Sequence, residues 1–174
     1  MSDKAKFHQG YFRPVNQAKC LSRTNIYRSS WELKFMEWAD RNPAIQRWAS
    51  EPVSVQYLNP VVNMEYCRKR NLDPKDKRNW KLSNYWTDFW IEVKERNTGK
   101  AKKIFIEIKP YKQTQKPYPL NESAPLKTIR RYNLETSTYL VNISKWSAAK
   151  KYFNDRGCDF MVVTEHTLEK LGLL

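Results

Sequence analysis

Two short segments, 86–94 and 103–110, alternate between aliphatic residues and charged or aromatic residues in the way that β-strands do. Successive side chains of a strand point to opposite faces. The second segment places Ile104, Ile106 and Ile108 on one face and Phe105, Glu107 and Lys109 on the other. If the aliphatic faces of both segments look into one core, the hairpin register puts Asp88 on the same face as Glu107 and Lys109.

This convergence of charged groups calls for a ligand or a partner. Opposite residues on one face of a strand pair lie about 4.5–5.5 Å apart, so two carboxylates and one ammonium would share a small patch. Mg²⁺ prefers oxygen ligands and commonly takes only one or two carboxylates. Asp88 and Glu107 are therefore candidate metal ligands, with Lys109 beside an attacking water. The alternative is a surface ladder of ion pairs, which is common and weakly stabilising. Glu92 shares this face but lies toward the turn, where we expect exposure to solvent.

Composition narrows the class of protein. The chain has 174 residues and a formal net charge of +14, which favours a single domain with an anionic partner. No apolar run approaches the roughly 20 residues of a membrane span. Four glycines leave no phosphate-binding loop. Three scattered cysteines suit neither zinc nor a disulfide framework and favour a reduced, cytoplasmic protein.

The basic charge is concentrated before the hairpin, in an insertion at about 62–84. Residues 68–81 hold seven basic and two acidic residues, a pattern typical of phosphate contacts. The candidate DNA-binding residues are Arg68, Lys69, Arg70, Lys77 and Arg78, continued after the hairpin by Lys112 and Gln113. The alternative interpretation of the insertion is a solvated loop that serves solubility.

Periodicity and helix breakers predict the remaining elements. Residues 1–26 lack a sustained period and are expected to form an arm. We expect helices from Ser29 or Ser30 to about Asp40 and over 143–155, strands over 52–58 and 160–163, and a last helix capped by Thr164. Most of the thirty residues after Pro110 are expected to be loop, with a short helix near 126–131.

Asp88 followed by Glu107-Ile108-Lys109 resembles the bipartite signature of the PD-(D/E)xK nuclease superfamily, with Thr87 in place of the usual proline. A wider series of segments resembles the head completion nucleases of T-even-like phages and, more distantly, the amino-terminal domain of the TnsA endonucleases. These segments are 27–35, 48–51, 108–113, 145–146 and 160–165, so that the resemblance covers about 27–171.

The resemblance implies an α/β restriction-endonuclease-like core, with a mixed central sheet flanked by helices, in one nuclease domain at 27–174. It implies cleavage of DNA with Mg²⁺, for which Mn²⁺ would substitute, after packaging and before tail joining. It adds the backbone carbonyl of Ile108 as a metal ligand, and Lys145 to the phosphate-binding residues. Portal or neck proteins are further partners that it suggests. The expected place of action is the host cytoplasm during assembly, with association with the virion left open.

Two questions stay open at this point. Glu32 fits a capping box with Ser29, yet the resemblance makes it an active-site acid delivered by the first helix. The function also has rivals: a DNA-binding structural head or neck protein without turnover, or a nuclease for branched DNA or RNA.

Overall fold

The computed structural model describes residues 9–95, 98–121 and 123–174. The chain forms two compact units, and the single nuclease domain expected at 27–174 stays a prediction. The first holds the described residues up to Ser54, together with Trp86–Lys109 and Lys150–Leu174; the second holds Val55–Tyr85 and Pro110–Ala149. The predicted insertion is therefore part of a larger unit that also takes in the segment after the hairpin.

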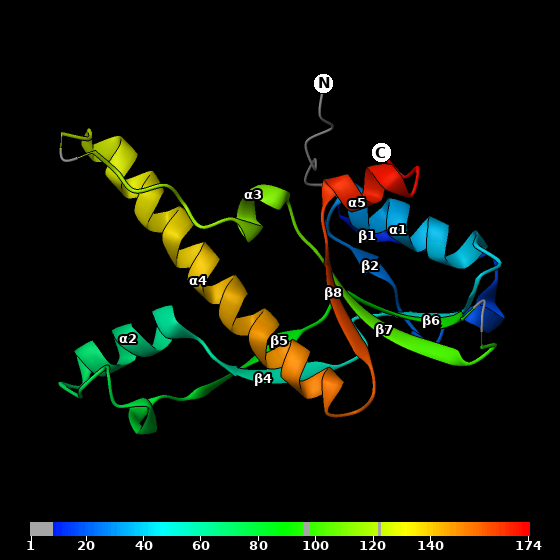
Figure 1. The fold of residues 1–174 in the computed structure, drawn as a ribbon, viewed down its shortest axis with the longest axis horizontal. Helices are drawn as coiled ribbons and strands as arrows, with labels where there is room; N and C mark the ends of the chain where they lie inside the picture. Colours follow the sequence, from blue (N-terminus) through cyan, green and yellow to red (C-terminus); the bar gives the residue numbers. More distant parts are fainter. Residues whose placement is uncertain (1–8, 96–97, 122) are drawn as a thin grey trace. The chain divides into compact units, whose positions relative to one another are not determined.

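The first unit is built on a four-stranded sheet in the order β3-β6-β7-β8, of which Figure 1 labels β6, β7 and β8. Its strands are β3 (Ile45–Ser50), β6 (Phe89–Lys94), β7 (Ala101–Ile108) and β8 (Asp159–Val163). The pairs β3–β6 and β6–β7 are antiparallel, whereas β8 runs parallel to β7. A parallel neighbour requires a crossover connection, which here contains the long helix α4 (Leu126–Asn154). The predicted mixed sheet is confirmed.

One face of this sheet forms the main core with helices α1 (Ser30–Arg41) and α5 (Glu165–Lys170). The aliphatic face of the hairpin lies here, as its alternation predicts. Phe35 of α1 packs against Phe89 of β6 with ring centroids 4.7 Å apart. The predicted limits of α1 hold because Ser29 caps its start and Asn42, followed by Pro43, ends it.

The other face of the sheet carries the charged residues of the hairpin beside an aromatic cluster. Phe105 of β7 stacks on Phe153, near the end of α4, with centroids 3.7 Å apart and planes 11° apart. Trp90, also on this face, is buried. The stacking of Phe105 on Phe153 packs the end of α4 on β7, two residues before Glu107.

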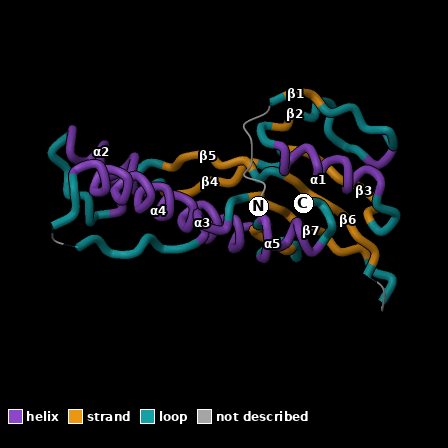
Figure 2. The backbone as a smooth tube through the Cα atoms, turned by 90° about the horizontal axis from the view of Figure 1, so that it is seen from above, coloured by secondary structure: helices purple, strands orange, loops and turns teal. Residues whose placement is uncertain are grey.

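The amino-terminal segment packs on the first unit over its described part, although the sequence predicts an arm. It contains β1 (Gly10–Tyr11), the 3₁₀ helix η1 (Gln17–Lys19) and β2 (Ile26–Tyr27), and β1 and β2 pair beside α1 in both views (Figures 1 and 2). The buried carboxylate of Asp40 accepts the N–H of Val15 at 2.9 Å. Lys19 donates to three carbonyls at the end of α1, those of residues 39, 40 and 42. These polar anchors leave no apolar period in the sequence. Residues 1–8 of the predicted arm lie outside the described residues.

The second unit contains most of a two-stranded sheet and three helices. The strands are β4 (Ser54–Leu58) and β5 (Leu82–Trp86), and the helices are α2 (Pro60–Lys69), α3 (Tyr111–Thr114) and the greater part of α4; the 3₁₀ helix η2 (Lys77–Asn79) lies in the loop after α2. The basic insertion is folded here, because the buried side chain of Asn63 bonds both the carbonyl and the N–H of Lys81.

Two predicted elements are wrong in their bounds. The strand expected at 52–58 pairs with β5, and the place in the main sheet belongs to β3, whose alternation is broken by a bulge between Ile45 and Arg47. The loop expected between the short helix near 126–131 and the helix over 143–155 is instead helical, because α4 runs unbroken for 29 residues. Its Ser and Thr residues cost only fractions of a kcal/mol each, about 0.5, and no Gly or Pro interrupts it.

Candidate active site

The hairpin register brings the predicted acids together. Phe89 pairs with Ile106 and Trp90 with Phe105, so the next position places Asp88 opposite Glu107. Asp88 is the residue just before β6, in the break that separates it from β5. Lys109 follows two residues after Glu107, and its Nζ lies 3.0 Å from Glu107 Oε1. The predicted placement of the three side chains on one face is confirmed.

The surroundings of this pair disfavour two negative charges. Glu107 is fully buried, with 2% of its surface exposed, while Asp88 keeps partial access to solvent. Burial, and then the negative charge of Glu107, raise the pKa of Asp88 from 3.8 to about 8. The ammonium of Lys109 and the N–H of Ile108, which donates to Asp88 Oδ2 at 2.7 Å, act in the opposite direction.

Lys109 remains a cation in this site. Burial alone would favour the neutral amine, but the charges of Glu107 and Asp88 outweigh it and raise the pKa of Lys109 above its ordinary value. One ammonium therefore faces two acids, of which Asp88, with its pKa of about 8, keeps its proton at neutral pH.

These groups fit a hard divalent cation. Because burial and mutual repulsion together raise the pKa of Asp88, a cation placed between the carboxylates would relieve the repulsion that Lys109 only partly offsets. In the part of the chain that the structure describes, no group of three or more His, Cys, Asp or Glu side chains could hold a metal ion. Two carboxylates with positions left for water suit Mg²⁺, which usually takes one or two carboxylates, better than zinc, which favours Cys and His ligands. The structure records the N–H of Ile108 on Asp88, so the role of its carbonyl stays a prediction.

Glu32 makes the contacts of a helix cap. Its N–H donates to Ser29 Oγ at 3.2 Å, and its carboxylate accepts from Ser29 Oγ at 3.0 Å and from the N–H of Arg28 at 2.8 Å. It is nevertheless close to the acids: after burial and the charge of Glu107, the charge of Glu32 also raises the pKa of Asp88. Both interpretations of Glu32 are thus compatible with its position.

Two neighbours of the site, Arg28 and Glu51, could not be assigned from the sequence. Arg28 is hydrogen-bonded and ion-paired with Glu51, which raises the pKa of the guanidinium. The N–H of Glu51 donates to the carbonyl of Asp88 at 2.9 Å. Glu51 has a left-handed backbone, with φ of 46°, which costs about 1–2 kcal/mol in a residue other than glycine. Arg28 and Glu51 are 23 residues apart in the sequence, so their ion pair could not be predicted from it. The one indication in the sequence was the position of an acid, Glu51, directly after β3.

Glu92 is buried, not exposed as the sequence predicts. It is 5% exposed, and its carboxylate accepts two hydrogen bonds of 3.0 Å from the guanidinium of Arg47. Arg47 lies on β3. Because the sequence did not predict this strand, it could not predict Arg47 as the partner of Glu92. The pair closes the charged face at the end away from Asp88.

The predicted DNA-binding residues belong to the second unit. They lie at the end of α2, in and beside η2, on α3 and on α4: Arg68, Lys69, Arg70, Lys77, Arg78, Lys112, Gln113 and Lys145. Several are already engaged: Arg78 pairs with Asp76, and Lys112 pairs with Glu135. The ammonium of Lys145 lies 5.3 Å from the ring centre of Tyr85. Their role in binding DNA stays a prediction.

No helix among the described residues has both the length and the apolar character needed to cross a membrane.

Two comparisons with known proteins agree with this arrangement. Residues 42–165 match the family model described as TnsA-like endonuclease N terminal. The chain is also similar to the head completion nuclease of Enterobacteria phage T4, with 35% identity over 147 residues, which is 84% of this chain and 82% of the phage protein. The family match includes the hairpin with Asp88, Glu107 and Lys109 and begins after Glu32. The restriction-endonuclease-like fold class is confirmed.

Proposed function

The chain belongs to the family of TnsA-like endonucleases, and from this premise we propose that it is a Mg²⁺-dependent nuclease that hydrolyses DNA phosphodiesters. The observation that carries the proposal is the pairing of Asp88 with Glu107, two acids held side by side with a lysine 3.0 Å away. The similarity to a head completion nuclease supports a role in finishing the phage head after packaging and before tail joining.

In this proposal Asp88, Glu107 and the carbonyl of Ile108 hold the metal, and Mn²⁺ substitutes for Mg²⁺. A bound divalent ion supplies Lewis acidity toward the phosphate and eases deprotonation of a water. Lys109 remains protonated and offsets the charge that develops on the phosphate oxygens. Glu32 orients the attacking water from the start of α1. Portal or neck proteins are the proposed partners at the head, and the proposed place of action is the host cytoplasm during assembly.

A cleavage assay on a panel of substrates tests the proposal. The panel comprises duplex DNA, single-stranded DNA, branched DNA and RNA, each with Mg²⁺, Mn²⁺, Ca²⁺ or EDTA. We expect cleavage of DNA with Mg²⁺ and Mn²⁺, binding without turnover with Ca²⁺, and no cleavage with EDTA. Binding without cleavage under every condition would favour the structural head protein instead. Cleavage confined to branches or RNA would favour the structure-specific nuclease.

The basic insertion should contribute broadly to affinity for DNA. Replacing Arg68, Lys69, Arg70, Lys77 and Arg78 with glutamine should weaken binding to all duplex sequences. Each lost phosphate contact should flatten the plot of log affinity against log salt by about 0.9. Fluorescence anisotropy over a salt series measures this slope. The control variant carries glutamine at three exposed lysines near the hairpin turn, Lys100, Lys102 and Lys103. It should leave the slope of log affinity against log salt unchanged. An unchanged slope in the insertion variant would instead assign this surface to a protein partner such as the portal or neck.

A further inference from the structure

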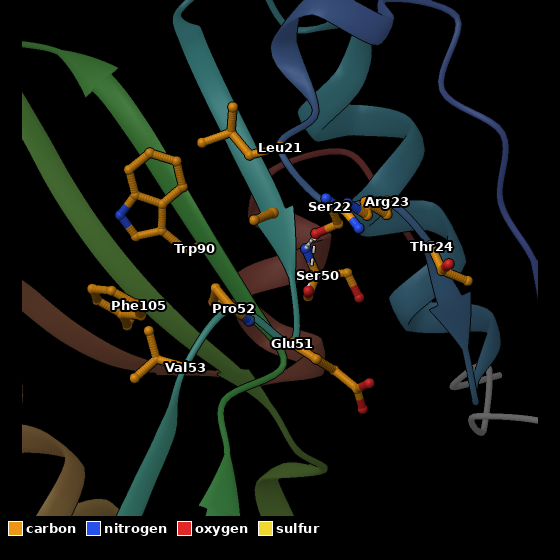
Figure 3. A pocket seen from close by; sticks show the side chains of 11 residues that line it. Leu21, Ser22, Arg23, Thr24, Ser50, Glu51, Pro52, Val53, Trp90 and Phe105 are labelled. Atoms are coloured by element: carbon orange, nitrogen blue, oxygen red, sulfur yellow. Dashed lines mark hydrogen bonds between the residues drawn. The ribbon is translucent and has the colours of Figure 1, made fainter.

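A pocket opens on the charged face of the sheet, next to the two acids. It has a volume of about 570 Å³, and Figure 3 shows Trp90 and Phe105 on one side of it and Ser22, Arg23 and Thr24 on the other. Glu51 and Val53, which follow β3, also line it. No sequence motif points to this pocket, because its walls come from four separate stretches of the chain.

The pocket adjoins the acids through its strands. Trp90 lies two residues after Asp88 and Phe105 two residues before Glu107, so all four side chains share one face. Glu51, in the pocket wall, donates its N–H to the carbonyl of Asp88 at 2.9 Å. A ligand in this pocket would therefore lie beside a phosphate held at the acids.

A second pocket of about 480 Å³ extends the first. The two share Ser22, Arg23 and Thr24, and the second continues to Tyr11 and Arg13 of the amino-terminal segment. Because the two pockets share this wall, we treat them as one surface and call it the 11–24 groove; its lining includes Tyr11, Arg13, Ser22, Arg23, Thr24 and Trp90.

The charges of the groove suit an anionic strand. Neither Arg13 nor Arg23 forms an ion pair within residues 9–95, 98–121 and 123–174. Glu51 is the acid that lines the groove, and Arg28 already pairs with it. Tyr11 is 75% exposed, so its ring is available to stack on a base.

The groove is held in shape by hydrogen bonds to the sheet. Ser22 Oγ donates to the carbonyl of Ser50 at 3.0 Å and accepts its N–H at 2.8 Å. Leu21 donates its N–H to the carbonyl of Trp48 at 2.9 Å. A wall fixed in this way to β3 is a preformed binding surface, in which ligand binding costs little ordering of the chain.

We propose that the 11–24 groove binds the unpaired DNA strand next to the phosphate that is cleaved. The two pockets have the volume of small-molecule sites, which suits single nucleotides and not a base-paired duplex. Arg23 and Arg13 contact successive phosphates, and Tyr11 stacks on a base, the combination that single-strand binding proteins use. The proposal rests on the proposed nuclease function and adds the substrate class: DNA with a frayed or single-stranded end at the cleavage point.

The test measures binding in EDTA, where no cleavage occurs. Blunt duplexes are compared with the same duplexes carrying 5′ or 3′ single-stranded tails. The wild-type protein should bind a tailed duplex about tenfold more tightly than the blunt one, the size of a single base-stacking contact. The double variant Arg13→Gln, Arg23→Gln should lose this preference, and its salt slope on tailed DNA should fall by about 1.4, or 0.7 for each lost contact to single-stranded phosphate. Tyr11→Ala should lose about tenfold on tailed DNA alone.

The control is the double variant Lys34→Gln, Arg41→Gln, which removes two basic residues around a different pocket of the same unit and should bind like the wild type. Melting curves exclude variants that fail to fold. Equal wild-type affinity for tailed and blunt DNA would overturn the proposal, as would equal losses on both DNAs in the groove variant. If the protein cleaves DNA but binds tailed and blunt DNA equally, the proposal for the 11–24 groove is wrong and the nuclease function stands. If it prefers tailed DNA but cleaves no DNA, the nuclease function is wrong and the groove proposal stands.

Discussion

Asp88→Asn should abolish DNA cleavage and, at the same time, stabilise the metal-free protein near pH 8. The loss of activity follows because an amide is a poor ligand for Mg²⁺ and carries no charge. The gain in stability follows because the amide can still accept the N–H of Ile108 but no longer repels Glu107. The two effects have one cause, the crowding of two acids for catalysis at the expense of the fold.

The pH dependence has a definite sign. Asp88 has a pKa of about 8 in the folded protein and 3.8 when unfolded, so between these values only the folded protein holds the proton. The free energy of unfolding therefore falls as the pH rises from 3.8 to about 8. Above about 8 the folded protein bears the full cost of an ionised Asp88. Each pKa unit corresponds to about 1.4 kcal/mol, and with Asp88 partly accessible to solvent we expect a net gain of about 1–3 kcal/mol from Asp88→Asn near pH 8 and almost none near pH 4.

Urea unfolding in EDTA at several pH values measures this difference, and a plasmid-nicking assay in Mg²⁺ measures activity. Glu107→Gln should also abolish cleavage, but it should destabilise by about 1–3 kcal/mol because Lys109 loses its charged partner. Asp155→Asn, at an exposed ion pair, is the control and should change neither property. Near-normal cleavage by folded Asp88→Asn would refute the assignment of the site. If the stability difference between Asp88→Asn and the wild type does not grow with pH, the proposed repulsion between Asp88 and Glu107 is wrong.

Glu32→Gln should reduce cleavage by about a hundredfold or more while leaving the melting temperature nearly unchanged. The amide oxygen can still accept the N–H of Arg28, so the start of α1 keeps its cap. A group that orients the attacking water needs the full carboxylate charge, which the amide lacks. Glu32→Ala should lose the activity and also about 0.5–2 kcal/mol of stability, the usual range for a lost helix cap.

Glu37→Gln is the matched control, because Glu37 is an exposed acid on the same helix. It should change neither cleavage rate nor melting temperature. Single-turnover cleavage rates and thermal melts of all three variants separate the two roles. Full activity in stable Glu32→Gln would assign Glu32 to the helix cap alone.

The parts of the fold that the sequence predicted are those set by local pattern. Strict alternation placed Ile104, Ile106 and Ile108 in the core, and the hairpin register then followed for Asp88 and Glu107. The limits of α1 followed from Ser29 and from Asn42-Pro43.

The parts that could not be predicted depend on contacts between distant residues or on broken patterns. The bulge in β3 removed the alternation that would have revealed it, and with it the partner of Glu92. The packing of residues 9–26 depends on Asp40 and Lys19, whose hydrogen bonds to backbone groups leave no period in the sequence. The Arg28–Glu51 pair joins two loops and could be found only in three dimensions.

The path of the chain between its two units carries a consequence for evolution and for kinetics. The chain leaves the second unit at Tyr85, three residues before Asp88, and enters it again at Pro110, directly after Lys109. Asp88 is thus joined to the basic unit through two residues, Trp86 and Thr87, and Lys109 is joined to it directly. If that unit binds DNA as we propose, the bound DNA would experience a high effective concentration of the acids, of about millimolar order for short tethers. Replacing the basic unit by recombination would use these two junctions and two more, after Ser54 and after Ala149, and would keep the order of the strands that carry the acids.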